Sequence, residues 1–239
     1  FIIDGRGITL DELEIVKNEK NLDKNEIGKE IISESNYISD AVNIIGKLNK
    51  PQQVTIDIGG GAAKTIAPKL LQEIGCQVET INDELDGCSR GPDPTSNELT
   101  ELVSKTKDLG FAFDLDSDRV ILVMNGEKKS SDITLGLGVV KAIKLGIKKF
   151  VLSIDSSLAV EKYIIQHGGK VSRSKVGEAN VIQMMIENDA EAGGEGSSGG
   201  FILKDFNMCR DGLLTSGLIA SLIDDESIQK DIEFFESFS

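Results

Sequence analysis

Short apolar runs alternate with longer amphipathic stretches along the chain, and this alternation restricts the possible folds more than any other feature. The apolar runs predict strands at 54–58, 77–81, 111–113, 120–124, 150–154 and 201–203, with a shorter one at 171–172. The amphipathic stretches predict helices at 10–20, 27–48, 62–74, 96–109, 135–145, 158–167, 178–188 and 212–223. Because strand–helix–strand units place parallel strands side by side beneath covering helices, we expect an α/β protein. It should contain two consecutive three-layer α/β/α domains with mixed, mostly parallel sheets.

A break in this pattern gives the domain boundary. The chain has 239 residues, which is enough for two hydrophobic cores. Gly126 and the Lys-Lys-Ser-Ser segment at 128–131 interrupt the alternation near the middle. We therefore predict one domain at 1–128 and a second at 129–239.

Charge and cysteine content exclude several classes of protein. The chain carries 40 acidic against 26 basic residues, a net charge of −14, so a nucleic-acid or anionic membrane partner is not expected. No apolar run approaches the roughly 20 residues of a membrane-spanning helix. Cys76, Cys88 and Cys209 are widely spaced and indicate neither a zinc site nor a disulfide framework. Reduced thiols are typical of cytosolic proteins, and we expect a cytoplasmic location.

The acidic loop between two apolar runs carries the strongest chemical signal. Asp114, Asp116 and Asp118 alternate along it and Arg119 follows. Three neighbouring carboxylates repel one another unless a cation lies among them, and a short loop of hard oxygen ligands suits Mg²⁺. A solvated turn is the alternative. A calcium-binding EF-hand loop would need Gly and Glu where Arg119 and Asn125 stand, whereas a phosphatase-like nucleophilic role for Asp114 stays open.

Other polar segments give weaker signals. The glycine-rich loop at 193–200 carries Glu195, Ser197 and Ser198, which could bind sugar hydroxyls, although its composition alone favours a flexible linker. The loop at 172–178 contains Arg173 and Lys175 and could hold a phosphate at a helix N-terminus, but the segment taken alone favours ordinary surface charge. Segment 57–63 predicts a tight turn, and the sole histidine, His167, is expected to cap a helix C-terminus.

Taken in order, these segments resemble the α-D-phosphohexomutases, which comprise phosphoglucomutase, phosphomannomutase and phosphoglucosamine mutase. The loop at 114–119 resembles their DxDxDR magnesium loop, and 194–199 resembles their sugar-recognition loop. The segment at 81–99 resembles the one that precedes the metal loop, and Arg210-Asp211-Gly212 the helix start after the sugar loop. Such an ordered set is far more specific than any single member.

The resemblance implies a function and a set of site residues. Family members interconvert hexose 1- and 6-phosphates through a phosphoserine and a bisphosphate intermediate. By this resemblance Asp114, Asp116 and Asp118 would hold Mg²⁺, and Arg119 would bind the transferring phosphate as a catalytic residue. Lys175 would be an acid/base candidate. Glu195 with Ser197 or Ser198 would bind the sugar hydroxyls of a hexose phosphate.

The chain also departs from the family pattern. It resembles only the middle two of four family domains: the phosphoserine motif of the first and the Arg-x-Ser-Gly-Thr phosphate loop of the fourth have no counterpart. Gly200 stands where the sugar loop commonly has His. We therefore expect the first and fourth domains to be present in cis in the complete enzyme, and the isolated chain to be inactive. The alternative is a non-catalytic sugar-phosphate-binding module derived from the family.

Overall fold

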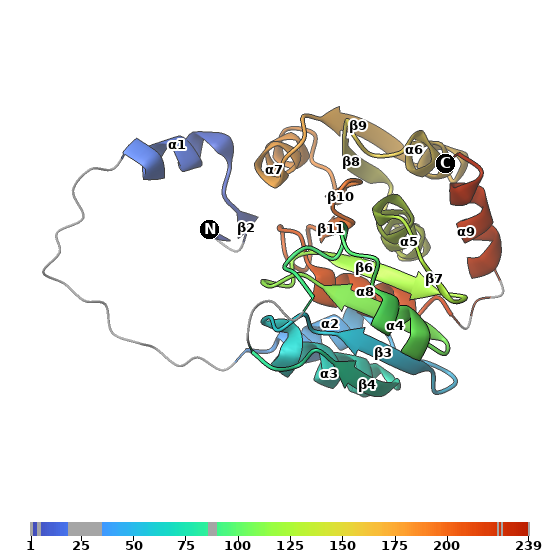
Figure 1. Cartoon of the computed structure of the whole chain (residues 1–239). Helices are drawn as coiled ribbons and strands as arrows, with labels where there is room; N and C mark the ends of the chain where they lie inside the picture. Colours follow the sequence, from blue (N-terminus) through green and yellow to red (C-terminus); the bar gives the residue numbers. More distant parts are fainter. Residues whose placement is uncertain are drawn as a thin grey trace, which may run out of the picture.

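The computed structural model describes residues 2–3, 6–18, 35–85, 90–223, 225 and 227–238. Its first large sheet has the order β4-β3-β5-β6-β7 (Figure 1). The strands are β3 (Gln53–Asp57), β4 (Gln77–Ile81), β5 (Leu109–Phe113), β6 (Val120–Met124) and β7 (Glu127–Lys128). The first three are parallel to one another, whereas β6 and β7 run antiparallel to their neighbours.

The second large sheet has the order β11-β10-β8-β9. Its strands are β8 (Lys149–Ser153), β9 (Lys170–Ser174), β10 (Ala192–Glu195) and β11 (Gly200–Leu203). Only β11 is antiparallel. Because the parallel strands of both sheets end at 57, 81, 113, 153, 174 and 195, the loops that follow them are the places where a ligand site is expected.

Helices cover both faces of each sheet. In the first half, α4 (Thr100–Lys105) lies on one face, while α3 (Ala63–Ile74) and α8 (Gly212–Ala220) lie on the other, with α2 (Tyr37–Ile45) packed on α3. In the second half, α7 (Glu178–Glu187) covers one face, while α5 (Ser131–Lys144) and α6 (Leu158–Gln166) cover the other. Helix α9 (Ile228–Glu236) packs against α5 and α6 (Figure 1). The expected pair of α/β/α layers is thus confirmed.

The largest hydrophobic cluster runs through both halves of the molecule. Helices α5 and α8 pack against each other between the sheets, and α8 covers β5 and β6 although it follows the second sheet in sequence. Gly217 permits the close approach of α8 to α2, since a Cβ there would lie 2.4 Å from Cδ1 of Ile45 on α2. Smaller clusters fill the spaces under α4 and α7. The two halves are therefore joined by shared apolar burial, which favours a fixed arrangement of the loops between them.

A short N-terminal hairpin and helix complete the described chain. Strands β1 (Ile2–Ile3) and β2 (Arg6–Gly7) pair antiparallel, and α1 (Leu10–Asn18) follows. The backbone N–H of Gly7 donates to the Met208 carbonyl at 2.8 Å, which ties this segment to the second half. No helix in the described part of the chain is long and apolar enough to cross a membrane.

Several predicted elements are confirmed closely. Strands 77–81 and 120–124 have the predicted bounds, and those predicted at 54–58 and 150–154 are shifted by one residue. Gly75 caps α3 in the left-handed conformation, and the Asp211 side chain accepts from the Leu214 N–H at the start of α8. His167 caps α6, with its Nδ1 2.8 Å from the Tyr163 carbonyl oxygen.

Other predicted bounds were wrong. The helix predicted at 96–109 covers only α4, because Leu99 has φ +52° and Leu109 begins β5. Gly110, the residue after that predicted helix, lies within β5, where a Cβ would be 2.3 Å from the Thr106 hydroxyl oxygen. The helix predicted at 27–48 is observed only as α2, and residues 27–34 lie outside the described residues.

Bounds in the second half also differ. Helix α5 begins at Ser131 rather than 135, because the Ser130 hydroxyl accepts from the Ile133 N–H. Strand β9 continues to Ser174, so Arg173 lies in a strand and not in the predicted loop. Gly193 and Gly194, expected in a loop, pair within β10, because small residues allow close packing under α7 and α5. The prediction ended α8 three residues too late and omitted α9.

Candidate active site

The acidic loop occupies the turn from β5 to β6 and brings its three carboxylates together. One oxygen atom from each of Asp114, Asp116 and Asp118 lies within 4.8 Å of the other two. Asp114 is 2% exposed, whereas Asp116 is exposed to solvent. Ser117, with φ +65°, turns the chain between Asp116 and Asp118. The predicted cluster of oxygen ligands is therefore present as a compact group at the carboxyl end of β5.

The electrostatics of this loop favour a bound cation. Burial, together with the neighbouring Asp118, raises the pKa of Asp114, and burial also raises the pKa of Asp118. Asp118 Oδ1 is buried without a hydrogen-bond partner among the described residues. Arg119 Nε lies 3.5 Å from this oxygen without a hydrogen bond to it. A buried carboxylate oxygen that lacks a hydrogen bond, beside two further carboxylates, favours a bound cation. The hard oxygen donors fit Mg²⁺.

Arg119 orients the first of these carboxylates. Its Nε donates to Asp114 Oδ2 at 2.6 Å, and its backbone N–H donates to Asp114 Oδ1 at 3.1 Å. Its Nη1 also donates to Asp93 Oδ2 at 3.2 Å. Both Asp114 oxygens are thus hydrogen-bonded and the residue is almost fully buried, which disfavours the nucleophilic role that the sequence left open. The Arg119 side chain remains 29% exposed.

A buried ion pair that sequence analysis missed supports the acidic loop from below. Arg90 Nε donates to Asp57 Oδ2 at 2.8 Å, and Arg90 Nη2 donates to the carbonyl of Phe113, the residue before Asp114. Gly59, at φ +60°, is needed here, because a Cβ would lie 2.8 Å from the guanidinium. The predicted tight turn at 57–63 therefore provides the surface against which the Arg90 guanidinium packs. Arg90 lies 33 residues from Asp57 along the chain, so no local sequence pattern indicated the pair.

The glycine-rich segment forms an ordered hairpin between β10 and β11. The Gly196 N–H donates to the Ser156 hydroxyl at 2.9 Å, and Gly196 packs so closely that a Cβ would lie 2.6 Å from the Ser156 backbone. Ser197 is exposed and helps to lower the pKa of the neighbouring Asp155, whereas Ser198 is 8% exposed. These contacts are those of a built loop, in contrast to the flexible linker that composition alone favoured.

Glu195 is buried at the base of this hairpin. Its Oε1 accepts from the Gly177 N–H at 2.6 Å, and its Oε2 accepts from Arg210 Nη1 at 3.0 Å. The residue is 3% exposed. Lys175, two residues before Gly177, is exposed at the end of β9, and no hydrogen bond or ion pair of its side chain occurs within the described part of the chain. Glu195 is therefore joined to the acidic loop through Arg210, and Lys175 is not.

Arg210 connects the two loops. Its Nη2 donates to Asp118 Oδ2, its Nη1 to Glu195, and its backbone N–H to Glu178 Oε1 at 2.7 Å. Sequence analysis treated Arg210 only as part of a helix-start motif. Because its partners lie far away in sequence, no local pattern could have identified this role.

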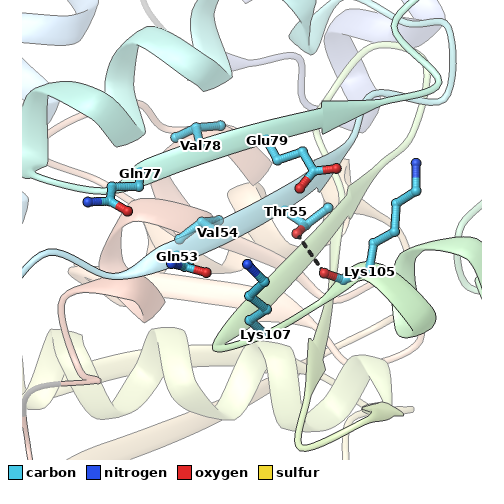
Figure 2. Close-up of a pocket in the computed structure, with 8 residues that line it drawn as sticks. All are labelled: Gln53, Val54, Thr55, Gln77, Val78, Glu79, Lys105 and Lys107. Carbon is cyan, nitrogen blue, oxygen red and sulfur yellow. Dashed lines mark hydrogen bonds between the residues drawn. The ribbon is translucent and has the colours of Figure 1, made fainter.

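Two hollows lie in different places. A cavity of about 330 Å³ adjoins Arg210 and the acidic loop, and the residues that line it include Asp116, Asp118, Glu178 and Tyr37. Figure 2 shows the other, on the face of β3 and β4, where Thr55 donates to the Lys105 carbonyl oxygen and Lys107 stands nearby. This second hollow lies towards the starts of the strands, away from the acidic loop, and is not part of the site.

Fold and site together define an α/β protein in which a carboxylate-rich loop faces a hairpin that carries exposed and buried hydroxyl groups. Residues 35–127 match the family model of phosphoglucomutase/phosphomannomutase alpha/beta/alpha domain II, and residues 131–237 match that of domain III. The chain therefore belongs to the phosphoglucomutase/phosphomannomutase family, the α-D-phosphohexomutases, and corresponds to its middle domains.

Similar curated proteins carry the name phosphoglucosamine mutase. A probable phosphoglucosamine mutase from Methanothermobacter thermautotrophicus is 35% identical over 184 residues, which are 74% of this chain and 40% of that protein. The phosphoglucosamine mutase of Campylobacter curvus is 36% identical over 187 residues, covering 73% and 41%. The chain thus spans less than half the length of these two relatives.

Solved structures share the fold. A putative phosphomannomutase from Thermus thermophilus superposes with a TM-score of 0.73 at 20% identity, covering 84% of this chain and 50% of that one. A phosphoglucomutase/phosphomannomutase family protein from Burkholderia thailandensis gives 0.71 at 23% identity, covering 84% and 46%. An Aspergillus fumigatus N-acetylphosphoglucosamine mutase, solved with GlcNAc-6P and magnesium, gives 0.59 at 13% identity, covering 85% and 52%.

Proposed function

We propose that this chain is the metal-binding and sugar-binding part of a phosphohexomutase of the phosphoglucosamine mutase, phosphomannomutase or phosphoglucomutase type. The complete enzyme would interconvert hexose 1- and 6-phosphates in the cytoplasm through a phosphoserine and a bisphosphate intermediate. The observation that carries the proposal is the meeting of two loops: the carboxylate cluster at 114–118 is joined through Arg210 to Glu195 of the glycine-rich hairpin. The names of the relatives support the same reaction class. We retain 1–128 and 129–239 as the proposed domains.

The acidic loop would hold Mg²⁺ through Asp114, Asp116 and Asp118. When bound, Mg²⁺ supplies positive charge that offsets the charge of the transferring phosphoryl group. Arg119 holds Asp114 in place with its Nε and N–H. Its guanidinium has five N–H donors, of which the described bonds use only part, so the side chain, 29% exposed, can also bind a phosphate.

The hairpin would bind the sugar. The sequence assigns sugar contacts to Glu195 with Ser197 or Ser198. Of these, the exposed Ser197 would contact the sugar ring, while Glu195 and Ser198, which are buried, would instead hold the loop in shape. Lys175 stands exposed at the edge of the second sheet and would be the acid/base candidate for the reacting hydroxyl.

The test is an assay of the complete reading frame with glucosamine, mannose and glucose 1- or 6-phosphates. We expect phosphomutase turnover that Mg²⁺ chelation abolishes, and no turnover by the isolated 239-residue chain. Asp116→Asn should abolish turnover and weaken Mg²⁺ binding, because it removes one charged ligand. Asp40→Asn, an exposed carboxylate on α2 with the same charge change, is the matched control and should leave both unchanged.

Two outcomes would contradict this proposal. Sugar-phosphate binding without turnover by the complete protein would identify the non-catalytic binding module instead. Full activity in Asp116→Asn would remove the metal assignment.

A further inference from the structure

Arg210 is the one described side chain that contacts both the carboxylate cluster and the glycine-rich hairpin through hydrogen bonds. It stands between β11 and α8 and is 20% exposed. Its two terminal nitrogens are divided between two carboxylates, with Nη2 on Asp118 and Nη1 on Glu195. The planar guanidinium fixes the directions of both bonds at once, which a lysine ammonium cannot do. A single group thus sets the positions of two loops from different sheets.

The bond to Asp118 leaves one oxygen of that carboxylate for a cation. Asp118 Oδ2 accepts from Arg210, whereas Asp118 Oδ1 has no hydrogen-bond partner among the described residues. Arg119 Nε lies 3.5 Å from Oδ1 and makes no hydrogen bond to it. Outer partners of this kind orient metal-binding carboxylates, and their loss typically weakens metal affinity about 10–100-fold.

The bond to Glu195 fixes the hairpin at its base. Glu195 bridges Arg210 to the Gly177 N–H, so both of its oxygens are used in holding β10 against the start of α7. Arg210 also packs on the hairpin itself, since a Cβ on Gly200 would lie 2.4 Å from Arg210 Cδ. A change in the position of the Arg210 guanidinium therefore changes the support of the hairpin.

We propose that Arg210 is a positioning residue that couples cation binding at the acidic loop to the order of the glycine-rich hairpin. A divalent cation on Asp118 draws part of that carboxylate's charge away from Arg210, which leaves the guanidinium to bind Glu195 more strongly. Cation binding should then order the hairpin and raise its affinity for a sugar phosphate. By reciprocity, a sugar phosphate bound to the hairpin should raise the affinity for the cation by the same factor. This inference rests on the proposed metal site but does not require turnover.

The experiment compares the chain with Arg210→Gln and Arg210→Lys. Mg²⁺ affinity is measured by calorimetry, and amide hydrogen exchange at 196–200 is measured with and without Mg²⁺. In the unaltered chain Mg²⁺ should slow exchange across the hairpin. Both variants should lose this effect and bind Mg²⁺ about 10–100-fold more weakly. Lys204→Gln, which removes a cation paired with exposed Asp189, is the matched control and should behave as the unaltered chain.

The charge-conserving variant decides between positioning and simple repulsion. If Arg210 only competes with Mg²⁺ for negative charge, Arg210→Gln should bind Mg²⁺ more tightly and Arg210→Lys should bind as before; that result would overturn the proposal. Mg²⁺ binding that leaves hairpin exchange unchanged in the unaltered chain would also overturn it while leaving the metal site intact. Failure of the unaltered chain to bind Mg²⁺ would overturn both the metal site and the coupling through Arg210. Lack of turnover in the complete protein would contradict only the proposed function. Circular dichroism checks that each variant is folded.

Discussion

The buried ion pair beneath the acidic loop allows a stability prediction with a defined magnitude. Arg90→Met removes the partner of Asp57, whose side chain is 2% exposed, and also removes the donor to the Phe113 carbonyl. Removing one partner of a buried pair strands a charge, which costs about 3–5 kcal/mol. At a urea m-value of ~2–3 kcal/mol/M, the unfolding midpoint should fall by roughly 1–2.5 M.

Urea unfolding followed by circular dichroism measures this effect, with two comparisons that isolate its cause. Lys105→Met breaks an exposed pair with Glu101 one helical turn away and should cost only about 0.3–0.5 kcal/mol. Adding Asp57→Asn to Arg90→Met should restore part of the loss, because the stranded charge is removed. A loss below about 1 kcal/mol for Arg90→Met, or no recovery in the double variant, would refute the idea that Asp57 depends on Arg90 for compensation.

Further predictions concern the hairpin and the thiols. In the complete enzyme, Ser197→Ala should raise KM for the hexose phosphate with little change in stability, because this hydroxyl is exposed. Ser198→Ala should instead lower the thermal midpoint, because its hydroxyl is buried. The reverse pattern would exchange the roles of the two serines. Gly196→Ala should cost about 1–3 kcal/mol in urea unfolding, since its Cβ would overlap the neighbouring backbone, and an unaffected midpoint would contradict the close packing. Burial raises the pKa of Cys76 to about 12, and burial together with the Glu178 and Asp211 carboxylates raises that of the partly exposed Cys209 to about 12. Both should react slowly with a thiol reagent at pH 8 and rapidly in urea, as followed by peptide mass spectrometry, and fast labelling of Cys76 in the folded chain would contradict its burial.

Much of the fold could be predicted because its signals are local. Strand β6 is five apolar residues between polar turns and was predicted with its observed bounds. Helix α4 was predicted too long because residues 96–109 have a helical pattern, while the Asn97 side chain bonds the Leu99 N–H and Leu99 adopts a left-handed conformation. Packing of Gly110 against Val123 of β6 then makes residues 109–113 a strand. The end of α4 and the start of β5 thus depend on contacts with residues that are distant in sequence, which a local sequence pattern does not contain.

In the site, too, local features could be predicted from the sequence, whereas features that depend on tertiary contacts could not. The alternation of Asp114, Asp116 and Asp118 in the sequence predicted a compact carboxylate cluster, and the fold confirms its geometry. The sequence also predicted the polar hairpin residues, but it did not assign different roles to the individual side chains. Burial separates exposed Ser197 from buried Ser198, and only the structure provides that burial.

The sequence by itself determined the α/β class, the order of the strands along the chain and the loop in which three carboxylates gather, because each depends on residues close together in the chain. Tertiary structure alone decided that α8 would cover the first sheet, that Arg90 would pair with Asp57, and that Arg210 would join Asp118 to Glu195. Those contacts depend on shared apolar burial between two sheets and on charges that need a partner once they are removed from water. Neither condition exists until the chain is folded.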